Sequence, residues 1–301
     1  MKIAIGSLGF GIGDNLGGSS VVAAKNAKEL VSRGHEVVFF CTNKKDKMSD
    51  LHNETIIKKI NGIKVVYLKT YTIPFWPGSF GPFYIPLLKK YLDKEGPFDI
   101  VYLNDYRTYI SMFISKWAFN KDIPFIVQPQ GTMVMGNKNI FLKRLFDLFY
   151  SKAILGKASM VIPVTNREKT LAINMGVKEI KLKVIPTGID IDAYKNIPDK
   201  GTFRDSYNIG KEKEMVLFVG RLDPIKGIDI LIEAYNDIKN ENNILVIIGH
   251  DHGVQREIEN LLKKLELNDN VLVTGALSDH RDVLSAMNDA DLMVVPSRSE
   301  G

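Results

Sequence analysis

The sequence predicts an α/β protein with two doubly wound domains that face each other across a cleft. Three observations lead to this prediction. Short apolar runs alternate with amphipathic stretches of helical length almost from end to end. The alternation falls into two series, separated by residues 184–203, which are rich in Pro, Gly and Asp. The net charge changes sign near the same place. We therefore expect an N-terminal domain over residues 1–186 and a C-terminal domain over residues 187–301.

The first series predicts a parallel sheet covered by helices on both faces. Its apolar runs are almost wholly hydrophobic, which is typical of strands buried on both sides. We expect strands over residues 3–6, 36–41, 63–68, 99–103, 124–128, 160–163 and 182–185. Amphipathic stretches predict helices over residues 18–33, 108–119 and 139–155.

The second series predicts a smaller parallel sheet. Strands are expected over residues 215–219, 245–248, 271–274 and 292–295, with the last buried and completing a four-stranded core. Helices are expected over residues 227–239, 254–265 and 281–287. Ligands of open parallel sheets bind beyond the carboxyl ends of the strands, so the loops at those ends are the candidate sites.

Composition narrows the class of protein. The chain is 45% hydrophobic and 25% charged, as in globular proteins. Its one cysteine, Cys41, excludes an internal disulfide and favours a reducing, intracellular setting. The first residues are too short and glycine-broken for a signal peptide, and no apolar run reaches the length of about 18 residues needed to cross a membrane.

Charge is divided unevenly along the chain. Residues 1–186 contain 27 Lys and Arg against 14 Asp and Glu, a net charge of +13. The rest contains 13 basic and 21 acidic residues, a net charge of −8. The two halves could meet different partners, or the lysines could simply cover a solvated surface. No nucleic-acid recognition motif accompanies the basic half, so we do not expect a nucleic-acid partner.

Two strand-to-helix turns have the composition of anion sites. The first, residues 9–20, has Gly17 and Gly18 before an expected helix whose free N–H groups could meet an anion. It lacks the dinucleotide-binding spacing, and a flexible loop remains the alternative. In the second, "VGRLDPIKGIDILIEA", a strand ends at Gly220, and Arg221 and Lys226 flank the turn. An arginine fork and a lysine point charge suit a diphosphate.

Longer segments resemble a known family. "FVGRLDPIKGIDILIEA" followed by "GALSDHRDVLSAMNDADLMVVPSRSEG" is similar to the nucleotide-sugar half of the family 4 retaining glycosyltransferases. "GGSSVVAAKNAKELVSRGHEVVFFCT", "GKASMVIPVTNREKTLAINMGV" and "KVIPTGID" resemble N-terminal segments of that family in the same order. The resemblance covers nearly the whole chain. It implies a GT-B fold, in which two Rossmann-like domains hold the active site between them.

The resemblance also implies roles for individual residues. Arg221 and Lys226 match the pair that neutralises the donor diphosphate as the leaving group departs. Glu300 matches the first glutamate of the E-x7-E motif, which holds the transferred sugar. The remaining implied binding residues match segments near the diphosphate, the acceptor or the nucleotide base, and are Gly17, Gly18, Gly220, Gly275, Ala276 and Leu277.

The sequence departs from the family pattern in two places. Many relatives carry a histidine before a glycine where this chain has Gln130, in "VQPQGTM". Glutamine does not titrate, so only a positioning role is expected there. The second glutamate of E-x7-E would fall seven residues beyond Gly301. We therefore expect a C-terminal domain that is incomplete, with the chain stopping inside the motif.

Three weaker patterns have competing interpretations. His250 and His252 in "HDH" suggest zinc, but their spacing is poor for a metal site and a replaced glycine-rich turn is favoured. Residues 73–86 are unusually aromatic and either dock a lipid-linked acceptor, enter a membrane interface or pack on their own domain.

The helix at residues 139–155 has Lys143, Arg144, Asp147 and Ser151 on one face and aromatic residues on the rest. We expect it to pack on the core; binding to an anionic membrane surface is the alternative.

Taken with the observations above, the family resemblance implies a retaining hexosyltransferase. It would use a UDP- or GDP-linked sugar and transfer the hexose to a hydroxyl of a glycolipid or polysaccharide precursor. The resemblance implies that no metal or other cofactor is needed, because Arg221 and Lys226 neutralise the diphosphate. The absence of a D-x-D motif fits, since the carboxylates nearest to a strand end, Asp105 and Asp223, are single. The expected location is the cytoplasm, peripheral at the inner membrane face. A sugar-nucleotide epimerase of the same fold and a non-catalytic nucleotide-binding fragment remain alternatives.

Overall fold

The computed structural model describes residues 1–11, 18–44, 50–72, 83–134 and 140–298. The chain forms two compact units, Met1–Gly188 and Ile189–Glu300, here called unit 1 and unit 2. Each unit has its own sheet and its own apolar core. Within the described ranges, no helix is both long and apolar enough to cross a membrane.

Unit 1 contains a seven-stranded sheet in the order β3-β4-β2-β1-β7-β8-β9. Every neighbouring pair is parallel except β3 and β4. The strands are β1 (Lys2–Gly6), β2 (Glu36–Thr42), β3 (Ile56–Ile60), β4 (Ile63–Leu68), β7 (Ile100–Asn104), β8 (Phe125–Gln128) and β9 (Met160–Val161). A separate short hairpin pairs β5 (Tyr71–Thr72) with β6 (Phe83–Tyr84).

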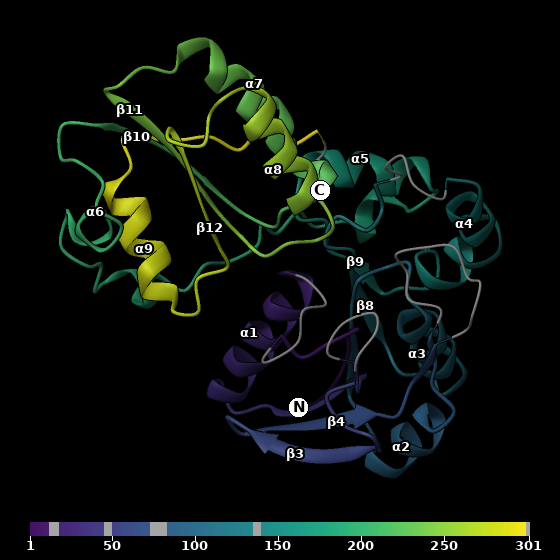
Figure 1. The fold of residues 1–301 in the computed structure, drawn as a ribbon. Coiled ribbons are helices and arrows are strands. Elements are labelled where there is room, and N and C mark those ends of the chain that lie inside the picture. The colour runs from purple at the N-terminus through teal and green to yellow at the C-terminus, as the bar shows by residue number, and fades with distance from the viewer. Residues whose placement is uncertain (12–17, 45–49, 73–82, 135–139, 299–301) are drawn as a thin grey trace. The chain divides into compact units, whose positions relative to one another are not determined.

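Helices cover both faces of this sheet because successive strand residues point to opposite sides. Ile3 and Ile5 pack in the cluster that contains the alanines of α1 (Gly18–Ser32), while Ala4 packs in the cluster on the opposite face. That opposite face is covered by α2 (Leu88–Glu95), α3 (Tyr109–Asn120), α4 (Ile140–Ile154) and α5 (Asn166–Asn174). Figure 1 shows α1 on one side of the unit 1 sheet and α2 and α3 on the other.

Unit 2 contains a fully parallel sheet in the order β12-β11-β10-β13. Its strands are β10 (Glu214–Val219), β11 (Asn243–Ile248), β12 (Val271–Gly275) and β13 (Leu292–Met293). Helices α7 (Ile228–Ile238) and α8 (Gln255–Lys264) pack on one face, and α6 (Thr202–Ser206) and α9 (His280–Asp289) on the other. The predicted four-stranded sheet is confirmed.

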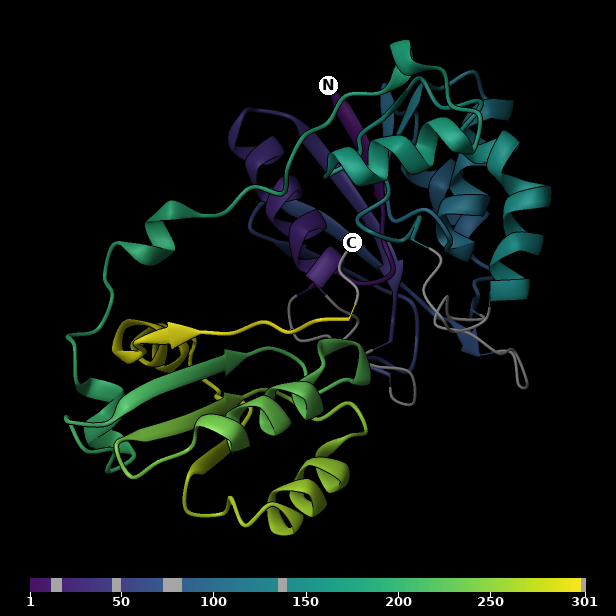
Figure 2. The ribbon, with the colours of Figure 1, turned by 90° about the horizontal axis from the view of Figure 1, so that it is seen from above.

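Two strand predictions need correction. Residues 292–295 were expected to be buried, but Leu292, Met293 and Val295 are exposed. The reason is that, among the described residues, β13 lies at the sheet edge and pairs only with β10 (Figure 2). Residues 182–185 form only an isolated bridge, between Val161 and Leu182, so they are an extended edge segment and not a full strand.

The expected orientation of the helix at residues 139–155 is wrong as well. The polar residues were predicted to lie opposite a core-packed aromatic face. Instead, Lys143 is buried and the Asp147 carboxylate forms an ion pair with Arg107 at 2.7 Å, while Phe141, Leu148 and Phe149 are exposed. The buried Arg107 guanidinium needs a carboxylate partner, and Asp147 is the residue of α4 that supplies it.

Candidate functional site

The carboxyl edge of the unit 2 sheet contains both cations predicted for the diphosphate. After β10 the chain passes through Gly220 and Arg221 and makes one 3-10 turn, Pro224–Lys226, before α7 begins. Backbone bonds fix this turn against the next strand: the Leu222 N–H donates to the His250 carbonyl at 2.9 Å. Arg221 is exposed and Lys226 is half-buried. Both cations are therefore held at the edge where ligands of parallel sheets bind.

Glycines let the strand ends approach closely at this edge. A Cβ on Gly249 would lie 1.7 Å from the Gly220 carbonyl oxygen. Gly227 has φ +67°, and a Cβ there would lie 2.3 Å from the Pro296 carbonyl oxygen. No side chain fits at either distance, so these positions require glycine. The loops after β10, β11 and β13 are thus packed backbone to backbone.

The segment predicted to meet the nucleotide base lies at the same edge. β12 ends at Gly275, which has φ +72° and accepts a 3.0 Å hydrogen bond from the Gly249 N–H. Ala276 is exposed beside it. Leu277 is half-buried and packs on the apolar cluster that contains Met215. Gly249 on the central strand end thus contacts both Gly220 and Gly275, which lie at the same sheet edge as the loop that carries Arg221.

The "HDH" segment has a structural role. The Asp251 carboxylate accepts the N–H groups of Gly253, Val254 and Gln255 at 2.9–3.0 Å and so occupies the N-terminus of α8. These bonds lower the pKa of Asp251. The part of the chain that the structure describes contains no group of three His, Cys, Asp or Glu side chains arranged to hold a metal.

His252 lies close enough to Arg221 for their charges to interact. Burial lowers the pKa of His252, and the charges of Arg221 and His250 lower it further. A neutral imidazole beside the Arg221 guanidinium is therefore expected at neutral pH. From the sequence, His252 was interpreted as part of a replaced glycine-rich turn in preference to a metal ligand, and nothing in the residue order placed it beside this cation.

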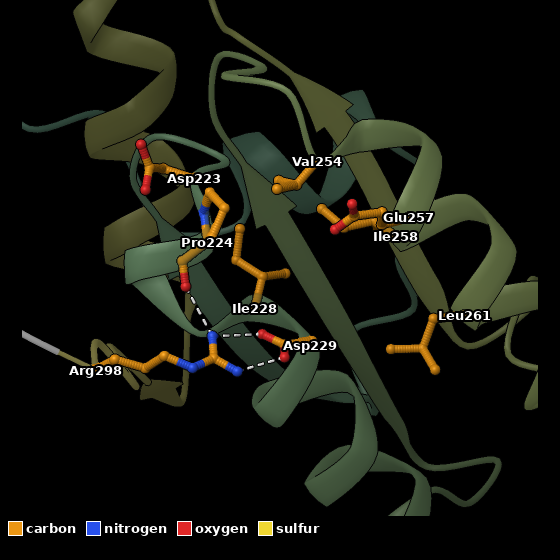
Figure 3. Close-up of a pocket in the computed structure, with 9 residues that line it drawn as sticks. All are labelled: Asp223, Pro224, Ile228, Asp229, Val254, Glu257, Ile258, Leu261 and Arg298. Carbon is orange, nitrogen blue, oxygen red and sulfur yellow. Dashed lines mark hydrogen bonds and ion pairs between the residues drawn. The ribbon is translucent and has the colours of Figure 1, made fainter. Parts of the chain in front are cut away.

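A pocket of about 240 Å³ adjoins this edge between α7 and α8 (Figure 3). Arg298 closes one end of it, donating to both carboxylate oxygens of Asp229 and, at 2.7 Å, to the Pro224 carbonyl. The Arg298 bonds lower the pKa of Asp229 and tie the segment after β13 to the start of α7. Neither Arg221 nor Lys226 lines this pocket, so it lies beside the predicted diphosphate position and does not contain it.

In unit 1, a strained turn after β8 presents Gln130. Gln130 has φ +53° and the following Gly131 has φ +78°. The buried Glu168 carboxylate holds this turn, accepting the Gly131 N–H at 2.8 Å and the Val164 N–H at 2.9 Å. Burial raises the pKa of Glu168. Glu168 thus holds the residue that follows Gln130, a contact that was not expected from the sequence.

Asp105 lies at the same edge, directly after β7. Its backbone has φ +79°, and burial raises the pKa of its carboxyl group to about 7, with the charge of Glu168 adding to the effect. One carboxylate oxygen receives long bonds from Ser19 at 3.4 Å and Asn104 at 3.5 Å. Its other oxygen, Ser20 Oγ and Gln130 Nε2 are buried without a hydrogen-bond partner.

We call Ser19, Ser20, Asn104, Asp105 and Gln130 the unit 1 edge cluster. Because buried polar atoms are normally paired, its unpaired atoms give this edge hydrogen-bonding capacity that the chain itself does not use. Gly18 begins α1 next to the cluster. Gly17 and Glu300 lie outside the described residues, as do residues 73–82 of the aromatic segment.

Two family models match the chain. The model described as Glycosyltransferase Family 4 matches residues 16–193, and the one described as Glycosyl transferases group 1 matches residues 199–301. The first covers more than half of the chain. The protein belongs to glycosyltransferase family 4.

Relatives of this family 4 member match over most of its length. An uncharacterised glycosyltransferase of Methanocaldococcus jannaschii is 24% identical over 94% of this chain and 71% of its own. The processive diacylglycerol alpha-glucosyltransferase of Acholeplasma laidlawii is 27% identical over 69% of this chain and 61% of its own. The structure of Anabaena HepE in complex with UDP aligns with a TM-score of 0.74 at 21% identity, covering 99% of this chain and 75% of that one. The predicted two-domain GT-B fold is confirmed.

Proposed function

We propose that this family 4 glycosyltransferase transfers a hexose from a UDP- or GDP-linked sugar to a hydroxyl of a glycolipid or polysaccharide precursor, with retention of anomeric configuration. The observation that carries the proposal is the position of Arg221 and Lys226 on one glycine-shaped turn at the carboxyl edge of the unit 2 sheet. Similar proteins add support, since HepE forms a complex with UDP and the A. laidlawii relative is a diacylglycerol glucosyltransferase.

The donor would bind in unit 2. Arg221 and Lys226 hold the diphosphate, and Gly275 to Leu277 face the base. When the bond between the sugar C1 and the phosphate oxygen breaks, negative charge grows on the phosphate, and the two cations stabilise it. They supply positive charge at the position where other transferases use a divalent ion, so the reaction is proposed to need no metal.

The acceptor would bind through the unit 1 edge cluster. Gln130 donates to the transferred sugar, and its turn is fixed by Glu168. The acceptor oxygen forms the new bond to C1 on the face that the phosphate leaves, and the hydroxyl proton passes to the departing phosphate oxygen. Atoms and charge then balance without an enzymic nucleophile, and the configuration is retained.

The location of the protein follows from the acceptor. A lipid-linked acceptor is available only at a membrane, so we propose that the protein works in the cytoplasm and binds peripherally to the inner membrane face. The charge of +13 on residues 1–186 favours a surface of anionic lipids.

Calorimetric titration with UDP and GDP, followed by product analysis with UDP-glucose and GDP-mannose in the presence of lipid extract, tests the function. A new glycoside with unchanged anomeric configuration, formed equally in EDTA, is the expected result. Nucleotide binding without turnover would instead support a non-catalytic nucleotide-binding protein. An epimerised sugar nucleotide without any glycoside would support the epimerase alternative.

A further inference from the structure

Helix α4 exposes an apolar stripe between Phe141 and Phe149. The residues Phe141, Leu145, Leu148 and Phe149 recur at helical spacing, and their exposed fractions are 76%, 40%, 73% and 65%. Arg144 and Lys152 lie on the same face by their spacing and are also exposed. We call these six residues the α4 stripe. An exposed apolar stripe of this size on a helix indicates an interaction surface.

The buried side of α4 determines this orientation. Arg107, fully buried, donates Nε to one Asp147 oxygen at 2.9 Å and Nη2 to the other at 2.7 Å. The Tyr106 hydroxyl also donates to Asp147, at 3.0 Å. Turning the apolar stripe inward would remove Asp147 from the buried guanidinium and leave that charge unpaired. The stripe is therefore fixed outward by bonds on the opposite face of the same helix.

The charge of the stripe favours a lipid surface over a second copy of the chain. Arg144 and Lys152 are its only charged residues, and Asp147, the one acid of α4, faces inward. Two copies meeting stripe to stripe would bring four cations together in a desolvated contact. Anionic lipid headgroups would instead neutralise the cations, while the aromatic and leucine side chains enter the acyl boundary.

The length of α4 defines how it would bind. With 15 residues it is shorter than the roughly 20 that a spanning helix needs. An amphipathic helix of this kind lies in the plane of the interface. We propose that the α4 stripe docks the protein on the surface of an anionic bilayer. This inference rests on the proposed function only in that a lipid-linked acceptor gives the docking a purpose.

Sedimentation with vesicles tests the docking. The purified chain should sediment with vesicles of phosphatidylglycerol and phosphatidylcholine, and should bind pure phosphatidylcholine at least tenfold more weakly. Replacing two apolar residues, Leu148→Ser with Phe149→Ser, should lower binding to the anionic vesicles by about tenfold or more. Reversing two charges, Arg144→Glu with Lys152→Glu, should have a similar effect.

Two matched controls are available in unit 1. Ile180 is 89% exposed and lies outside α4, so Ile180→Ser removes an equally exposed apolar side chain elsewhere. Lys178→Glu reverses an exposed charge beside it. Neither control should change vesicle binding by more than about twofold. Circular dichroism of all variants shows whether they remain folded.

The position of α4 in the lipid can be measured directly. Phe149→Trp should give a tryptophan emission that shifts to the blue on adding anionic vesicles and is quenched by brominated acyl chains. Ile180→Trp should do neither. This paired readout does not depend on how strongly either variant binds.

Four results would overturn the proposal: no vesicle binding by the unchanged chain, equal binding to neutral and anionic vesicles, equal loss of binding in the Ile180→Ser control, or dimers abolished by Leu148→Ser.

UDP titration of the same variants separates the docking proposal from the proposed function. The α4 stripe belongs to unit 1 and the diphosphate turn to unit 2, so UDP affinity should be unchanged in every α4 variant. Vesicle binding without binding of either UDP or GDP would defeat the proposed donor site and leave the docking intact. Nucleotide binding without vesicle binding would defeat the docking and the proposed membrane location and leave the donor site intact.

Discussion

The carboxyl edges of the two sheets are built in opposite ways. In unit 2 the edge presents exposed or half-buried cations, Arg221 and Lys226, on backbone that glycines bring close together. In unit 1 the edge is buried, and its main charged groups are the carboxyls of Asp105 and Glu168, whose pKa values are both raised by burial. One edge is suited to an anion, and the other to hydroxyl groups that need neutral hydrogen-bond partners.

The largest expected effect concerns the buried carboxyl of Asp105. Its folded-state pKa of about 7 lies above the ordinary value of 3.8, so protonation favours the folded state. Its stabilising contribution is complete below pH 4 and is lost as the pH rises through 7. Asp105→Asn should remove this dependence, so its free energy of unfolding should rise relative to the unchanged chain by about 4 kcal/mol between pH 4 and pH 8. Urea unfolding at both pH values measures the difference.

Asp93 offers a control of opposite sign. Bonds from Lys89 and Trp117 lower its pKa to about 2, so its contribution is present at neutral pH and is lost on acidification through that value. Asp93→Asn should therefore lower the free energy of unfolding at neutral pH, and its difference from the unchanged chain should shrink only as the pH falls from about 4 towards 2. Relative to the unchanged chain, the unfolding free energies of the two variants should therefore change with pH in opposite directions. A change in the same direction would show that the Asp105 carboxyl is not in the buried site described above.

The second largest effect concerns turnover. Arg221→Ala and Lys226→Ala should each lower kcat by about a hundredfold or more, the scale observed when a group that stabilises a developing anion is removed. The free energy of unfolding should change little for Arg221→Ala, because its side chain is exposed. Arg256→Ala on α8 in the same unit is a matched control for an exposed arginine. Rates near those of the unchanged chain in both variants would show that the unit 2 edge does not hold the diphosphate.

A third effect concerns the backbone that shapes the unit 2 edge. Gly227→Ala places a methyl group against the Pro296 carbonyl in addition to the strain of a positive φ, and should cost about 2 kcal/mol or more in unfolding free energy. Gly253 also has a positive φ, +98°, but open space around its Cβ position. Gly253→Ala therefore measures the strain alone. Equal losses in the two variants would contradict a backbone contact between the β10 and β13 loops.

The sequence predicted the elements that bury apolar residues, because a buried parallel strand must be apolar on both faces. Strand β3 was missed for the same reason: Lys58 and Lys59 are exposed at the sheet edge and break the apolar pattern. The amphipathic character of α4 was also visible, but not which face turns inward. Arg107 decides that, and it lies 40 residues away in the sequence from Asp147.

The candidate site also contains residues that the sequence could identify and residues that only the folded structure reveals. Arg221, Lys226 and Gly227 lie close together in the sequence, so residue order alone showed a cation-bearing strand-to-helix turn. Glu168 could be recognised only as the third residue after Thr165, a spacing typical of a helix start, which Thr165 indeed caps. That its carboxylate reaches Gly131, 37 residues away, depends on the packing of α5 beside β8 and β9 and has no local signal.

The smallest predicted effect tests whether Glu168 acts through Gln130. In Glu168→Gln, the amide keeps one acceptor oxygen, so either the Gly131 or the Val164 N–H loses its bond, at a cost of about 1–3 kcal/mol. A purely structural role would lower stability and leave the kinetics of the folded enzyme unchanged. A positioning role should lower kcat about tenfold at temperatures where the variant is fully folded. The KM for the donor should change less, because donor affinity is proposed to come mainly from the diphosphate contacts of Arg221 and Lys226. Glu179→Gln, which removes an exposed ion pair with Lys169, should change neither quantity.

Gln130→Ala should lower kcat on its own, and adding Glu168→Gln to it should lower kcat no further. Full additivity of the two losses would mean that Glu168 supports the fold of unit 1 without setting the geometry of its edge.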